Sequence, residues 1–123
     1  MLTSRQESGR CAEELAAQYL RAQGLEILAR NYRRRFGELD IVARESEVLV
    51  VAEVRTRASD AFGGAAASVG WRKRARITRA ASALLQQHRE LARLPVRFDV
   101  LIVSDPLGSA PTIQWLRHAF EAS

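Results

Sequence analysis

Apolar side chains repeat with helical spacing in two stretches of the chain, residues 6–23 and 71–92. In both stretches they recur at the spacing that places them on one side of a helix. Gly24 directly follows the first stretch and is a common helix stop. The pattern therefore predicts two amphipathic helices. Their apolar stripes consist of Ala12, Leu15, Ala16, Tyr19 and Leu20 in the first helix and Ile77, Ala80, Ala81, Leu84, Leu85 and His88 in the second.

Five other segments carry strand-forming residues, several of them alternating with polar ones. These segments are residues 25–33, 37–43, 48–57, 95–103 and 112–116. The short connection around Glu47 is typical of a hairpin, and residues 105–108 have the composition of a turn. The order helix, three strands, helix, two strands predicts an α/β protein, with a mixed sheet of about five strands flanked by helices.

Two carboxylates interrupt the second and third strand segments. Asp40 and Glu53 stand among β-branched and aliphatic residues, where an ionised group is unusual. Folding the hairpin back brings Asp40 beside Glu53, with Arg55 next along the strand. Neighbouring carboxylates repel each other unless a cation bridges them, so the pattern favours a magnesium-type site. The alternative is structural: Asp40 pairs with Arg55 across the strands, and Glu53 lies in solvent on an edge strand.

Length and composition indicate one compact domain over residues 1–123, since 47% of the chain is hydrophobic. No apolar run approaches the ~20 residues of a membrane-spanning helix. The first residues lack the apolar core of a secretion signal, so we expect a cytoplasmic protein. The single cysteine, Cys11, excludes an internal disulfide and supplies too little sulfur for a zinc–cysteine site.

The chain is basic, with 19 lysine and arginine residues against 14 acidic ones and a net charge of +5. A surplus of this kind favours polyanionic partners, but nucleases, ribosomal proteins and membrane-surface proteins share it. Lys73 is the only lysine in the sequence. This preference for arginine bears on Arg55, because an arginine there reflects overall composition as well as local function.

The start of the second helix is strongly basic. Arg72, Arg76 and Arg79 share a helix face, with Lys73 alongside. Cations near a helix N-terminus oppose the helix dipole, so this cluster does not serve helix stability. A phosphate ligand would explain it; the alternative is an ordinary solvated helix face.

Several sequence blocks, in order along nearly the whole chain, resemble a known family. The spacing D-x12-E-x-R of Asp40, Glu53 and Arg55 resembles the D…(D/E)-x-K signature of restriction-endonuclease-like nucleases. More closely, the chain is identified as a member of the YraN family of small bacterial proteins, which is related to the Holliday-junction resolvases. The blocks that carry this resemblance are Gly9-x3-Glu13-x2-Ala16-x2-Tyr19-Leu20, Arg30–Arg33, Gly37–Asp40, Val51–Arg57, Phe62–Val69, Lys73, Arg97–Val100 and Ala119–Phe120.

The resemblance implies a restriction-endonuclease-like fold and a magnesium or manganese ion held by Asp40, Glu53 and the carbonyl of Val54. Glu13 would assist, since it lies at the border of the apolar stripe whereas Glu14 points away from it. Arg55 stands where the fold usually places lysine, and it cannot act as a general base because it keeps its proton. Glu38 would either support Asp40 or cap the strand entrance.

Other polar residues receive structural interpretations. Asp99 is expected to pair with an arginine, and neither His88 nor His118 has a metal-ligand partner at useful spacing. The glycine-containing segment at residues 58–70 is expected to form a flap beside the site. The sequence thus predicts a metal-dependent endonuclease for branched or structured DNA, in which junction cleavage would require a homodimer. The alternative is a nucleic-acid-binding or adaptor module that kept the fold without the chemistry.

Overall fold

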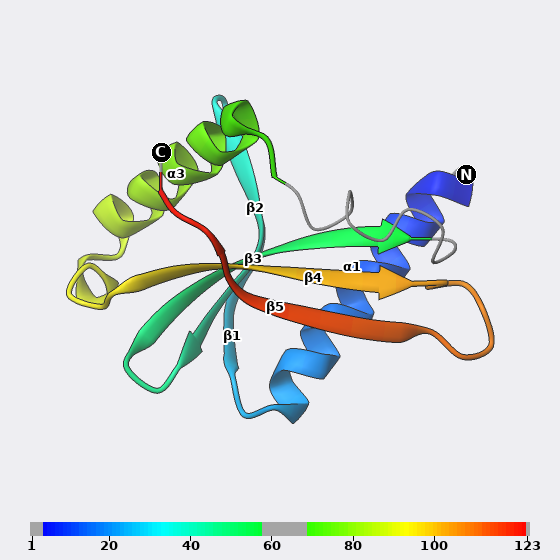
Figure 1. Ribbon diagram of the computed structural model, residues 1–123. Helices are drawn as coiled ribbons and strands as arrows, with labels where there is room; N and C mark the ends of the chain where they lie inside the picture. Colours follow the sequence, from blue (N-terminus) through cyan, green and yellow to red (C-terminus); the bar gives the residue numbers. More distant parts are fainter. Residues whose placement is uncertain (1–3, 58–68, 123) are drawn as a thin grey trace.

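The computed structural model describes residues 4–57 and 69–122 (Figure 1). The described elements follow the order expected from the sequence, with three strands between the two long helices and two strands after them. In chain order they are α1 (Ser4–Ala22), β1 (Glu26–Arg34), β2 (Gly37–Glu45), β3 (Val48–Arg57), α3 (Trp71–Gln87), the 3-10 helix η2 (Arg89–Leu91), β4 (Val96–Ser104) and β5 (Thr112–Phe120).

The strands form one mixed sheet in the order β1-β2-β3-β4-β5. Three neighbouring pairs are antiparallel, and β3 pairs with β4 in parallel. A parallel pair needs a crossover connection, which α3 provides between β3 and β4. The prediction of an α/β protein with a mixed five-stranded sheet is confirmed.

The two long helices cover opposite faces of the sheet (Figure 1). On one face, Ile77 and Leu84 of α3 pack with Leu49 and Val51 of β3. On the other, α1 packs against Val50 and other alternate strand residues. The α1 face uses small helix residues, chiefly Ala12, Ala16 and Ala17, which let the helix approach the sheet closely.

Two predicted boundaries are wrong at their C-terminal ends. The second helix ends at Gln87 rather than at residue 92, because His88 leaves the helical conformation (φ −127°, ψ 76°). The last strand continues to Phe120 rather than ending at residue 116. Its extension is held by tertiary contacts, including a stacked pair of rings, Phe98 and Phe120, with centroids 5.1 Å apart.

Within the two described ranges, no helix is long and apolar enough to cross a membrane. The expected flap at residues 58–70 falls almost wholly outside the described residues, as do Phe62, Gly63 and Gly64 within it.

Candidate functional site

Asp40 lies where strand β2 separates from β3. The pairing of the two strands runs from Glu45–Val48 to Ile41–Ala52, so Asp40 and Glu53 are the next residue of each strand. There the carboxylate of Asp40 replaces a backbone partner: the Val54 N–H donates to Asp40 Oδ2 at 2.9 Å. The hairpin thus places Asp40 beside Glu53, as the sequence pattern predicts.

Glu53 is buried in the middle of the sheet, with only 1% of the residue exposed. The structural alternative of a solvated Glu53 on an edge strand is therefore wrong, because β3 lies between β2 and β4. Lys73 of α3 brings its Nζ to 3.3 Å from Glu53 Oε1. The other carboxylate oxygen, Oε2, is buried and has no hydrogen-bond partner among the described residues. A buried acceptor without a partner is costly unless a ligand or ion satisfies it.

The electrostatics of this pair favour the neutral carboxyl forms. Burial, reinforced by the negative charge of Asp40, raises the pKa of Glu53 to about 7, although Lys73 opposes the shift. Burial also raises the pKa of Asp40, against the lowering effect of its hydrogen bond from Val54. The folded protein therefore holds two carboxyl groups that a bound cation would help to ionise.

Glu38 precedes an irregularity in the alternation of β2. Leu39 packs on the α3 face whereas Ile41 packs on the α1 face, so the alternation is interrupted at Asp40. The interruption occurs where β2 leaves β3. The side chain of Glu38 is exposed and pairs with Arg33 at 3.1 Å. Its charge still contributes to raising the pKa of Asp40, so it belongs to the surroundings of the acidic pair.

Helix α1 brings Glu13 toward the same region. Burial and the charge of Asp40 raise the pKa of Glu13, while a hydrogen bond from Asn31 lowers it. Glu14 instead forms an ion pair with Arg30 at 3.0 Å. Even so, within the described part of the chain no three histidine, cysteine or acidic side chains converge closely enough to hold a metal ion. The described residues therefore offer no third acidic, histidine or cysteine ligand beside Asp40 and Glu53.

Arg55 lies two residues beyond Glu53 on β3 and acts on both carboxylates. Its positive charge is among the smaller influences that lower the pKa values of Asp40 and Glu53. The structure thus brings two cations to the acidic pair, Arg55 from the strand and Lys73 from helix α3. Lys73 makes direct contact with the pair, its Nζ lying 3.3 Å from Glu53 Oε1.

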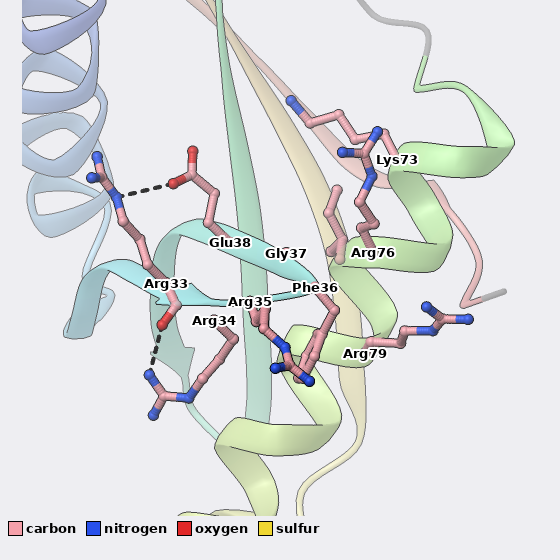
Figure 2. Close-up of a pocket in the computed structure, with 10 residues that line it drawn as sticks. Arg33, Arg34, Arg35, Phe36, Gly37, Glu38, Lys73, Arg76 and Arg79 are labelled. Carbon is pink, nitrogen blue, oxygen red and sulfur yellow. Dashed lines mark hydrogen bonds and ion pairs between the residues drawn. The ribbon is translucent and has the colours of Figure 1, made fainter.

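The basic residues predicted on α3 divide between two places. Lys73, Arg76 and Arg79 line a groove of about 680 Å³ between the helix and the turn that joins β1 to β2 (Figure 2). Arg72 is not among the lining residues of that groove; its guanidinium lies 5.2 Å from the centre of the Trp71 ring. Lys73 links the groove to the acidic pair, because it lines the one and contacts the other.

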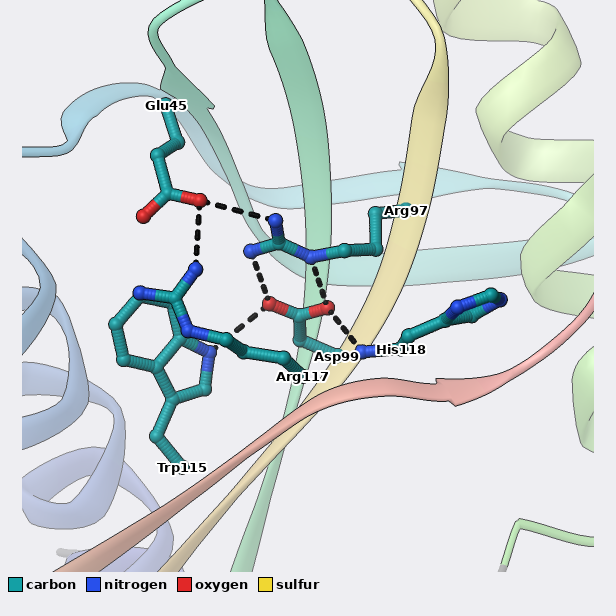
Figure 3. Close-up of polar contacts among 6 residues, drawn as sticks. All are labelled: Glu45, Arg97, Asp99, Trp115, Arg117 and His118. Atoms are coloured by element: carbon teal, nitrogen blue, oxygen red, sulfur yellow. Dashed lines mark hydrogen bonds and ion pairs between the residues drawn. The ribbon is translucent and has the colours of Figure 1, made fainter.

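Asp99 has the structural role that the sequence predicts. Arg97 donates to both carboxylate oxygens at 2.8 Å, and Trp115 Nε1 and the backbone N–H of His118 donate at 2.9 Å (Figure 3). Glu45 binds Arg97 from the other side and also Arg117. The imidazole of His118 contacts Glu121 instead, and His88 ends helix α3.

The sequence did not predict the wall of the groove that lies opposite α3. This wall consists of the last two residues of β1, Arg33 and Arg34, and the turn residues Arg35 and Phe36. The signal that could have found it is the basic run between two strands, with an aromatic residue at its end. Pattern alone does not show that this turn lies against α3, because the two segments are about forty residues apart.

Comparison with known proteins agrees with the sequence blocks. A family model described as "Uncharacterised protein family UPF0102" matches residues 12–103. A UPF0102 protein of Stutzerimonas stutzeri is 44% identical over 121 residues, covering 98% of this chain and 100% of the relative. One of Xanthomonas euvesicatoria is 45% identical over 122 residues, covering 99% and 98%, and one of Legionella pneumophila is 40% identical over 117 residues, covering 95% and 97%. The chain therefore belongs to the UPF0102 family, the family of YraN.

Proposed function

We propose that the protein is a metal-dependent endonuclease that hydrolyses phosphodiester bonds in branched or structured DNA. One observation carries the proposal. Asp40 and Glu53 lie side by side where two strands separate, and the buried Oε2 of Glu53 has no hydrogen-bond partner among the described residues. A basic groove begins at the lysine that contacts Glu53.

The residues present fit a hard divalent cation. Magnesium and manganese prefer carboxylate and carbonyl oxygens, which Asp40, Glu53 and the carbonyl of Val54 can supply. When bound, such an ion neutralises phosphate charge and lowers the pKa of water. It would also offset the burial and the repulsion from Asp40 that raise the pKa of Glu53.

The cationic side chains would act on the phosphate. Lys73 has a half-exposed side chain, so its ammonium can reach a substrate while staying near Glu53. Arg55 keeps its proton at any working pH, which suits charge stabilisation and excludes a role as general base. We therefore assign the role of the lysine usual in this fold jointly to Arg55 and Lys73. Glu13 would assist from the α1 side of Asp40.

A second candidate is a DNA-binding or adaptor module without cleavage. The contact between Lys73 and Glu53 favours it, because a lysine can itself neutralise a buried carboxylate and leave no need for a metal ion. Both candidates bind nucleic acid, so affinity does not separate them. We also propose a cytoplasmic location, where DNA is present, and a homodimer, because cutting a junction takes two active sites.

Metal-dependent cleavage separates the two candidates. We expect wild type to nick four-way junctions or flaps in magnesium or manganese, and Glu53→Gln to abolish nicking while DNA affinity is kept or increased. The affinity should not fall, because the substitution removes a negative charge near the phosphates. Arg55→Lys should retain cleavage. Product formation is followed on labelled junctions, flaps and single strands.

Glu47→Gln is the matched control, since Glu47 is an exposed glutamate in the turn between β2 and β3. It should cleave like wild type. In parallel, the metal should raise the melting temperature of wild type but not of Asp40→Asn, by mass action on the folded state. If wild type and Arg55→Lys nick none of the substrates in either metal, the adaptor function replaces the nuclease.

A further inference from the structure

The groove between the β1–β2 turn and helix α3 has a charge and shape that the acidic pair does not explain. Six basic side chains line it, three from each wall, against one acidic side chain, Glu38. Figure 2 shows the end of β1 and the β1–β2 turn, which carry Arg33, Arg34, Arg35 and Phe36, beside the part of α3 that carries Lys73, Arg76 and Arg79. So many cations around one groove repel one another, which points to an anionic ligand there.

Part of this charge is held in place and part is open. Arg33 pairs with Glu38, and Arg34 donates to Gln87 and lies over the Tyr32 ring. By contrast, Arg35, Arg76 and Arg79 have no carboxylate partner within residues 4–57 and 69–122. Arg33 and Arg34, which have partners, shape one wall of the groove. The three arginines without a carboxylate partner among the described residues are available to a ligand.

The two walls meet at Gly37. A Cβ atom at this position would lie 2.5 Å from the carbonyl oxygen of Arg76, closer than any side chain tolerates. Only glycine lets the turn approach the helix this closely. The separation of the walls is therefore set by backbone contact rather than by flexible side chains.

An aromatic ring stands beside the cations. Phe36 is 38% exposed and lines the groove, so its ring is accessible to a ligand there. Basic residues that follow a phosphate backbone, combined with an exposed ring on which bases stack, are typical of sites for single strands. The groove volume, about 680 Å³, is that of a small-molecule site, so it admits part of one strand rather than a duplex.

We propose that this groove binds an unpaired strand of nucleic acid, with Arg35, Arg76 and Arg79 on its phosphates and Phe36 stacked on a base. The inference rests on the proposed nucleic-acid substrate but not on cleavage. If the groove acts in this way, a substrate must contain an unpaired segment next to the bond that is cut. Lys73 lies at the end of the groove that reaches Glu53, so a strand held there leads toward the acidic pair.

The test measures binding without cleavage, by anisotropy of labelled oligothymidylate and of a blunt duplex in EDTA across a salt series. Wild type should bind the single strand more tightly. Arg35→Gln and Arg76→Gln should each reduce the slope of log affinity against log salt by about 0.7, the value for one phosphate contact on a single strand. Phe36→Leu should weaken binding by roughly fivefold or more, while Phe36→Tyr keeps the ring and the affinity.

Arg21→Gln is the matched control, because Arg21 is exposed on α1 and lies outside the groove lining. It removes the same charge and should leave the slope unchanged. The proposal is overturned if the groove variants behave like Arg21→Gln, if Phe36→Leu binds like wild type, or if the duplex or polyglutamate binds as tightly as the strand. If the groove variants lose binding but the protein shows no metal-dependent nicking, the strand-binding proposal holds and only the nuclease proposal is overturned.

Discussion

The sheet buries two acidic regions that are built in opposite ways. Around Asp99, four hydrogen bonds from Arg97, Trp115 and His118 saturate both carboxylate oxygens (Figure 3). Around Glu53, a single half-exposed lysine contacts one oxygen, the other oxygen has no hydrogen-bond partner among the described residues, and a second carboxyl group lies alongside.

The number of hydrogen-bond donors distinguishes the structural carboxylate, Asp99, from the candidate functional pair, Asp40 and Glu53. A saturated carboxylate offers a ligand no further binding capacity, and its partners link β4 to the end of β5. An incompletely satisfied pair reduces stability, and proteins keep such sites where binding or chemistry needs them. Burial alone therefore does not identify a functional carboxylate; the number of its donors does.

The largest expected effect comes from breaking the saturated region. Asp99→Asn should reduce the free energy of unfolding by about 3–5 kcal/mol, because it leaves the largely buried Arg97 without the carboxylate that binds it in two places. Urea denaturation measures the change. The control is Glu121→Gln, which removes an exposed carboxylate just after the end of β5 and should change stability little. A loss below about 1 kcal/mol for Asp99→Asn would contradict a structural role.

The next effect has the opposite sign and depends on pH. Because the pKa of Glu53 is raised from its ordinary value of 4.5 to about 7, the folded state binds its proton more tightly than the unfolded chain does. The resulting stabilisation is complete below pH 4.5 and is lost as the pH rises through 7. Glu53→Gln stays neutral throughout, so it should be more stable than wild type at pH 8, by on the order of 2–3 kcal/mol.

The gain should nearly vanish at pH 4.5, where wild type is also neutral at this position. Denaturation curves of both proteins without metal, at several pH values, measure it. A constant difference across the range, or a variant less stable than wild type at pH 8, would mean that Lys73 compensates fully for the burial of Glu53.

The sequence predicts most of the fold and part of the site, and the division has a physical reason. Helix stripes and the Asp40–Glu53 hairpin depend on residues close in the chain, and these predictions hold. The contact of Lys73 with Glu53 depends instead on how the crossover helix packs. The full length of β5 likewise depends on Asp99 and Phe98 of another strand. Periodicity carries no information about either contact.

The smallest expected change in stability is that of Lys73→Gln, which removes the cation beside Glu53. Lys73→Gln should lower the free energy of unfolding by less than about 1 kcal/mol, because the lysine is half exposed and Glu53 can take up a proton when it is gone. Arg97→Gln, the matched change in the saturated region, should cost about 3 kcal/mol or more, since it leaves Asp99 buried without its main partner. The cleavage rate should be affected more by Lys73→Gln than by Arg97→Gln. It should fall by about a hundredfold or more in Lys73→Gln if the Lys73 ammonium stabilises phosphate charge. Urea denaturation and nicking of a labelled junction measure the two quantities on the same samples. If Lys73→Gln lost as much stability as Arg97→Gln and still cleaved like wild type, Lys73 would be a structural counter-ion, and the contrast between the two regions would fail.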